Sequence, residues 1–116
     1  MSDALNAFFD AWSETDPAGQ LILIAKTVAE NARYADPRTD GVEGVEDIAA
    51  YVAQFAQMAP GATAEVIASE TRDGVTRATV RFAMPGGMEQ LGQYFAETDA
   101  SGLLTRLVGF KGTGEG

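Results

Sequence analysis

At Pro60-Gly61 the hydrophobic pattern changes its period for the rest of the sequence, and this change constrains the fold more than any other feature of the sequence. Before it, apolar residues recur with the spacing of helices that bury one face. After it, apolar and polar residues alternate between turn signals, as in antiparallel strands. Helices gathered ahead of a strand meander indicate the α+β class. No internal repeat or linker interrupts the pattern, so we expect one domain over residues 1–111 and a flexible glycine-rich tail at 112–116.

Three helices are predicted in the first part of the chain. The first covers residues 3–15, and its apolar stripe consists of Leu5, Phe8, Phe9 and Trp12. The second runs from Pro17 to about residue 28, because an aspartate cap (Asp16) followed by proline favours a helix start. The stripe of the third, which ends at Pro60-Gly61, consists of Ile48, Val52, Phe55 and Ala59.

A short extended segment separates the second helix from the third. Alternation over residues 32–37 places Tyr34 and Asp36 on one face. Pro37 keeps Asp36 out of the helical region of backbone space. Glycines at positions 41 and 44 then predict a turn before the third helix.

Four strands are predicted after residue 61, over residues 64–71, 75–84, 89–98 and 103–110. Asp73-Gly74 gives the clearest hairpin signal between two of them. On the third of these strands, Tyr94 shares a face with small and polar residues, whereas Leu91 and Phe95 lie opposite. The pattern leaves open which of the two faces is turned inward. A curled sheet packed on helices would leave a concave side available as a pocket.

The sequence contains no cysteine and no histidine, which excludes thiol nucleophiles, thiolate zinc sites and imidazole bases. A catalytic acid or base must therefore be Asp, Glu, Tyr or Lys, and the two lysines are Lys26 and Lys111. We expect no cofactor. The acidic segment 40–47 lacks the spacing of a calcium loop, so we expect a solvated turn there and no metal site.

The charge balance bears on partners and location. With 17 acidic and 8 basic residues the net charge is −9, which predicts repulsion from nucleic acids and from anionic membrane surfaces. A membrane-spanning apolar run of about 20 residues is missing, and so is a secretory signal pattern at the start of the sequence. A cytoplasmic location is the resulting expectation. An exposed sheet face would offer a surface for a homodimer.

Several short segments, in a fixed order, resemble one superfamily of folds. They are residues 8–16, Tyr34-Ala35-Asp36-Pro37, Gly44, Pro60-Gly61, Gly92-Gln93-Tyr94 and residues 99–104. Their order and spacing resemble the nuclear-transport-factor-2-like superfamily, and within it the SnoaL-like and ketosteroid-isomerase-like proteins. The resemblance implies a cone-shaped, cystatin-like fold, with three N-terminal helices on a curved, mostly antiparallel sheet that encloses a pocket. The superfamily contains isomerases, cyclases, dehydratases, epoxide hydrolases and binding proteins without activity, so the fold alone does not choose among them.

The resemblance also implies roles for individual residues. Asp36-Pro37 is similar to the aspartate-proline pair that supplies the general base of ketosteroid isomerases, which are themselves a standard example of tuned carboxyl groups. Phe8 falls on or next to the position of that family's helix-1 tyrosine, and Tyr94 falls near its protonated aspartate. Steroid isomerase activity itself is therefore not expected, although Tyr94 could donate a hydrogen bond to a substrate oxygen. Asp36 has an alternative role as a turn former whose carboxylate binds a nearby backbone amide.

The predicted function follows from these residues. We expect a protein that binds a small apolar molecule, and that could be a cofactor-free isomerase or cyclase with Asp36 and Tyr94 as catalytic residues. The alternative is a non-catalytic ligand-binding or protein-interaction module of the same fold. The residues expected to line the pocket, each of which could instead be ordinary core, are Phe8, Trp12, Tyr34, Tyr51, Phe55, Phe82, Met84 and Leu107.

Overall fold

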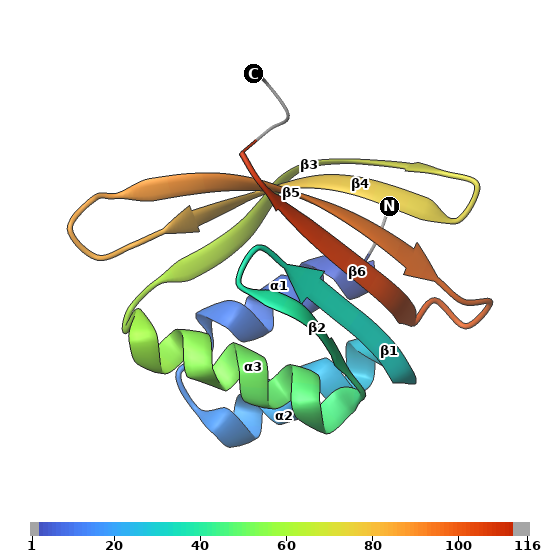
Figure 1. Ribbon diagram of the computed structural model, residues 1–116, viewed down its shortest axis with the longest axis horizontal. Coiled ribbons are helices and arrows are strands. Elements are labelled where there is room, and N and C mark those ends of the chain that lie inside the picture. Colours follow the sequence, from blue (N-terminus) through green and yellow to red (C-terminus); the bar gives the residue numbers. More distant parts are fainter. Residues whose placement is uncertain (1–2, 113–116) are drawn as a thin grey trace.

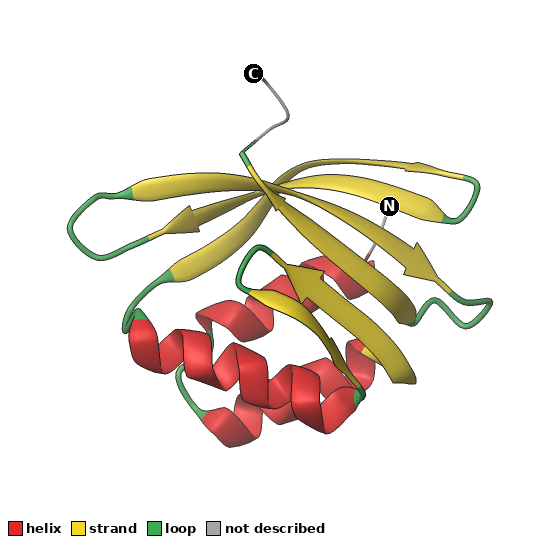
Figure 2. Cartoon of the chain, viewed as in Figure 1, coloured by secondary structure: helices red, strands yellow, loops and turns green. Residues whose placement is uncertain are grey.

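Three helices lie beneath a six-stranded mixed sheet that curls over them (Figure 1). The computed structural model of the chain describes residues 3–112. Its helices are α1 (Asp3–Ser13), α2 (Pro17–Thr27) and α3 (Val45–Met58). Its strands are β1 (Val28–Asp36), β2 (Thr39–Glu43), β3 (Thr63–Arg72), β4 (Val75–Ala83), β5 (Glu89–Thr98) and β6 (Leu104–Lys111). Helices and strands occupy separate layers (Figure 2), so the predicted α+β class is confirmed.

The strands follow the order β2-β1-β6-β5-β4-β3 across the sheet. Strands β1 and β6 are parallel, and every other neighbouring pair is antiparallel, as expected of a mostly antiparallel sheet. The sheet stays open, because β2 and β3 form its two edges. Strand β6 therefore lies in the middle and joins the β1–β2 hairpin to the β3–β4–β5 meander.

The connection between α2 and α3 differs from the prediction. Residues 39–43, expected as part of a turn, form strand β2, and the turn lies earlier, at Pro37-Arg38. Proline favours the second position of a tight turn and aspartate the first. Asp36 supports this turn directly, since its carboxylate Oδ1 accepts a hydrogen bond of 2.9 Å from the backbone N–H of Arg38. Local turn chemistry at residues 36–38 thus outweighed the glycine signals at 41 and 44.

The core lies between the sheet and the helices, and α1 supplies its largest side chains. Phe8, Phe9 and Trp12 are at most 3% exposed. The structure also shows which face of β5 is turned inward. Tyr94 is buried with its face turned to the helices, whereas Leu91 and Phe95 on the opposite face are 37% and 38% exposed. Tyr94 therefore lies on the concave side of the sheet.

The predicted tail at 112–116 lies outside the described residues apart from Gly112. Within residues 3–112, none of the helices has the length and apolar character needed to cross a membrane.

Candidate functional site

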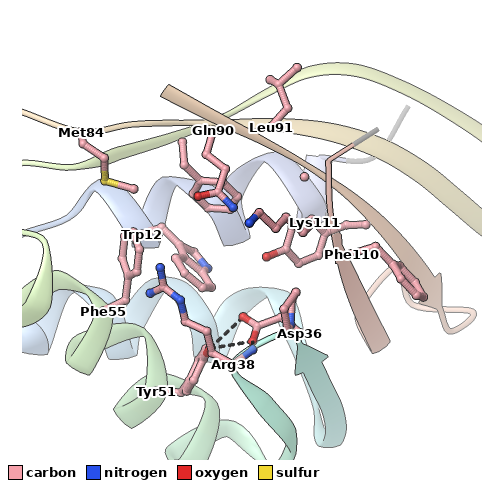
Figure 3. Close-up of a pocket in the computed structure, with 14 residues that line it drawn as sticks. Trp12, Asp36, Arg38, Tyr51, Phe55, Met84, Gln90, Leu91, Phe110 and Lys111 are labelled. Atoms are coloured by element: carbon pink, nitrogen blue, oxygen red, sulfur yellow. Dashed lines mark hydrogen bonds between the residues drawn. The ribbon is translucent and has the colours of Figure 1, made fainter. Parts of the chain in front are cut away.

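A cavity of about 290 Å³ opens on the concave side of the sheet, between α1, α3 and the strands (Figure 3). Its apolar wall comes mainly from Trp12, Tyr51, Phe55, Phe82 and Met84. Its polar side chains come from Asp36, Arg38, Gln90, Tyr94 and Lys111. This mixture of an aromatic wall and a few converging polar groups is typical of sites that bind small molecules.

Asp36 lies at the end of β1, where its carboxylate accepts hydrogen bonds from three donors. The hydroxyl of Tyr34 donates to Oδ2 at 2.8 Å, and the backbone N–H of Arg38 donates to Oδ1. The hydroxyl of Tyr51, on α3, lies 2.7 Å from Oδ1 and 2.8 Å from Oδ2, so its single proton is shared between the two oxygens (Figure 3). The three donors hold the carboxylate in one orientation at the edge of the cavity. Asp36 thus performs the turn-forming role and lines the cavity as well.

The network continues from Tyr34 to Tyr94, whose hydroxyl oxygens are 2.9 Å apart. A phenol has one proton to donate. Because Tyr34 directs its proton to Asp36, the bond between the two phenols uses the proton of Tyr94. Four side chains from β1, α3 and β5 therefore form one chain of hydrogen bonds. In this arrangement the proton of Tyr94 points at Tyr34 and away from the cavity.

Burial keeps these phenols protonated. It raises the pKa of Tyr34 well above its ordinary value, and the neighbouring Tyr94 and the Asp36 charge raise it further. Burial is also the main cause that raises the pKa of Tyr94 and of Tyr51. Neutral phenols can donate hydrogen bonds but do not act as bases. Within the network, Asp36 is the group that can accept a proton.

The Tyr94 ring has room only because its neighbour on β6 is a glycine. Gly109 pairs with Tyr94 across the two strands. A Cβ atom added at Gly109 would lie 2.5 Å from Cε2 of the Tyr94 ring, well inside contact distance. The glycine therefore lets the phenol lie flat against β6 and reach Tyr34.

Trp12 presents an unusual polar atom to the same region. The side chain is 3% exposed and lines the cavity. Its indole Nε1–H is the one buried side-chain nitrogen or oxygen within residues 3–112 that has no hydrogen-bond partner. An unsatisfied buried donor costs about 1–3 kcal/mol. Figure 3 shows this nitrogen on the ring edge that faces the middle of the pocket.

Arg38 and Lys111 also line the cavity, although neither was predicted as a site residue. The Arg38 guanidinium lies 5.9 Å from the centre of the Phe55 ring, and Lys111 extends from the other side beside Gln90 (Figure 3). Strand alternation contained the signal for Lys111, which continues the face of Leu107 and Gly109. Arg38 lies in the turn after β1, where alternation does not apply.

The structure brings most of the predicted site residues together. Asp36 and Tyr94 both line the cavity, and so do Trp12, Tyr51, Phe55, Phe82 and Met84. Phe8, Tyr34 and Leu107 are fully buried and lie outside the lining. Tyr34 lies behind the residues that line the cavity and is linked to Asp36 and Tyr94 by hydrogen bonds of its hydroxyl group. Phe8 packs on Tyr34, with ring centres 5.9 Å apart.

No metal site accompanies these residues in the described part of the chain. Among residues 3–112, the structure holds no group of three carboxylates placed to bind a metal ion. The acidic segment 40–47, which spans β2 and the start of α3, is no exception.

Comparison with known proteins gives a consistent family. The sequence profile of the SnoaL-like domain matches residues 5–105. A candidate isomerase of the SnoaL-like family from Agrobacterium tumefaciens is 27% identical, with 95% of each chain covered and a TM-score of 0.87. A candidate polyketide cyclase from Sinorhizobium meliloti is 20% identical, with 94% of each chain covered and a TM-score of 0.77. No protein of curated function matches the sequence.

A third solved structure bears on the fold. It is a nuclear-transport-factor-2-like protein from Cytophaga hutchinsonii, 16% identical, with a TM-score of 0.68 over 95% of this chain and 88% of that chain. This likeness confirms the predicted fold, three helices packed on a curved, mostly antiparallel sheet, with the sheet left open at its edges.

Proposed function

Because the chain belongs to the SnoaL-like family, we propose that it is a cofactor-free isomerase or cyclase that moves a proton in a small carbonyl-containing or cyclic molecule. The main support is the position of Asp36, a carboxylate at the edge of a largely aromatic cavity. The 27% identity to a candidate isomerase of the same family points to the same class of reaction.

Asp36 would act as the general base. A carboxylate has about four lone-pair directions, and three donors occupy this one, which leaves one direction for a substrate proton. In the proposed step, a C–H bond next to a carbonyl breaks, the proton goes to Asp36, and the electron pair moves onto the carbonyl oxygen as an enolate. Return of the proton to another carbon gives an isomer. Attack of the enolate carbon on a second carbonyl instead closes a ring, and the proton on Asp36 passes to the alkoxide oxygen formed there.

Tyr94 would supply a hydrogen bond to the developing enolate oxygen. To do so, its proton must turn from Tyr34 to the substrate. The bond given up contributes about 0.5–1.5 kcal/mol, a cost that a stronger bond to an oxyanion can offset. The phenol chain would thus hold Tyr94 in place until a substrate oxygen competes for its proton.

Proton exchange tests this proposal without knowledge of the natural substrate. Cyclic ketones such as 2-tetralone would be incubated with the protein in heavy water, and loss of the α-proton signal followed by nuclear magnetic resonance. We expect exchange above the buffer rate with the wild type and not with Asp36→Asn. Asp10→Asn, an exposed change on α1 with the same chemistry, is the matched control. Full exchange with Asp36→Asn would refute the role of Asp36.

The second candidate is a binding module without chemistry. Its support is that the carboxylate and the three phenols already satisfy one another. Apolar molecules would then raise the melting temperature equally in the wild type and in Asp36→Asn, with no proton exchange in either. If no small molecule raises the melting temperature, the favoured hypothesis becomes a module that binds a protein partner.

A further inference from the structure

Apart from the Gln90 amide, which both donates and accepts hydrogen bonds, the polar groups in the cavity that lie outside the phenol network share one chemical preference. They are the indole N–H of Trp12, the guanidinium of Arg38 and the ammonium of Lys111. All three are donors, and none of them can accept a hydrogen bond. They line a cavity whose remaining wall is largely aromatic. A ligand that fits them needs an apolar body and a group rich in acceptors.

The charges indicate that this acceptor group is an anion. The charged residues that line the cavity are Asp36, Arg38 and Lys111, which leave one net positive charge with Asp36 ionised. The protein as a whole carries −9, so a positive cavity runs against its overall charge. In the described part of the chain, the ion pairs are formed by Arg72, Arg77 and Arg81. Arg38 and Lys111 belong to none of those pairs and remain available to a ligand.

The unpartnered N–H of Trp12 is an independent observation that points to the same ligand. It is buried, it faces the pocket, and within residues 3–112 it lacks an acceptor. This N–H is covered in the structure, so a small shift of the indole would be needed to bring it into contact with a ligand oxygen in the cavity. A ring that carries this oxygen-bearing group would contact Phe55 and Phe82. The centres of these two rings lie 4.8 Å and 5.7 Å from the centre of the Trp12 ring.

We propose that the cavity binds a small cyclic carboxylate, with its carboxylate oxygens received by Trp12, Arg38 and Lys111. This inference rests on the proposed function in naming the substrate class of the same cavity. A carboxylate is favoured over a phosphate because one net positive charge matches a monoanion. Arg38 and Lys111 are then the residues that select a charged ligand over a neutral ligand of the same shape.

A pair of ligands that differ only in charge tests the inference. Adamantane-1-carboxylate and adamantane-1-carboxamide share one rigid apolar body, and their binding would be measured by titration calorimetry. We expect the carboxylate to bind at least about tenfold more tightly, a preference that rising salt weakens. Inorganic phosphate should not compete. Trp12→Phe should weaken both ligands, because each presents an oxygen acceptor.

Matched double variants assign the preference to its residues. Arg38→Gln/Lys111→Gln should reduce the preference for the carboxylate to less than about threefold. Lys26→Gln/Arg106→Gln removes the same two charges from exposed positions on α2 and β6, so it controls for net charge and should retain the preference. The same pairs built on cyclohexane and naphthalene rings extend the test to other ring shapes.

Equal binding of acid and amide, equal loss of preference in both double variants, or no binding with any of the three ring systems would overturn the inference. These measurements do not involve proton transfer. A preference for the carboxylate without α-proton exchange would therefore refute only the proposed catalysis. Proton exchange on neutral ketones without a preference for the carboxylate would refute only the proposed substrate class.

Discussion

The chain has three tyrosines, and all three belong to the hydrogen-bonded group around Asp36. Each has a pKa raised by burial, whereas phenols of the unfolded chain titrate near about pH 10. Above that pH, the unfolded chain releases protons that the folded protein retains. The free energy of unfolding should therefore be constant below about pH 9 and fall as the pH rises from about 10 toward the folded-state pKa values.

The size of this loss follows from the burial of each phenol. A group whose folded-state pKa lies well above 11 loses about 1.4 kcal/mol of stabilisation by about pH 11. Tyr34 and Tyr94, which are buried, together lose about 3 kcal/mol by about that pH. Tyr51 is only half-buried, so solvent screening makes its share smaller. The free energy of unfolding of a small domain is about 5–15 kcal/mol in total, so the loss is a large fraction of it.

Urea unfolding at a series of pH values measures this effect, with the fluorescence of the single tryptophan, Trp12, as the probe. Tyr94→Phe removes one buried phenol and should remove about half of the loss due to the buried pair. The reasoning fails if phenolate absorbance appears with a midpoint near about pH 10 while Trp12 fluorescence still reports a folded protein.

Two further predictions concern single residues of the sheet. Gly109→Ala should destabilise the fold by about 1–3 kcal/mol, because the new methyl group meets the Tyr94 ring. Adding Tyr94→Leu, which removes the colliding ring atoms, should recover part of that loss in urea unfolding; wild-type stability of Gly109→Ala alone would contradict the contact. The expected homodimer would use the outer face of the sheet, where Phe95 and Phe110 are 38% and 53% exposed with ring centres 5.8 Å apart. Light scattering should then show a dimer that Phe95→Glu converts to monomers, and a monomeric wild type at micromolar concentration would exclude this dimer.

Features coded by neighbouring residues were predictable. The start of α2 follows from its cap, since Asp16 accepts a hydrogen bond from the Ala18 N–H and Pro17 occupies the first helical turn. The hairpin at Asp73-Gly74 follows from residues that tolerate positive φ, and both adopt it, at 54° and 80°. Asp36 and Tyr94 were identified as candidate site residues by the family resemblance, and alternation placed Asp36 on the same face as Tyr34 but left the inward face of Tyr94's strand open.

Features that depend on distant segments were not predictable. Strand β2 exists because β1 offers it an edge, which no local pattern in residues 39–43 reveals. The inward face of β5 depends on which side the helices cover. The network around Asp36 needs Tyr51 from α3 and Tyr94 from β5, and only the folded chain brings these together. The position of Lys111 could have been inferred from alternation along β6, but the glycine-rich tail beside it obscured the pattern. Arg38 lies in a turn, where alternation gives no orientation.

The central position of β6 has a consequence for how the protein is made. During synthesis, the β1–β2 hairpin and the β3–β4–β5 meander leave the ribosome first, one with Asp36 and the other with Tyr94. Until residues 104–111 follow, each half ends in an unpaired edge open to wrong partners. The last strand closes both edges in one event, and its pairing with β1 spans most of the chain length, which favours slow folding. A nascent chain therefore acquires its cavity only once β6 has been synthesised, and a chain cut short before β6 would lack the complete cavity and be prone to aggregate.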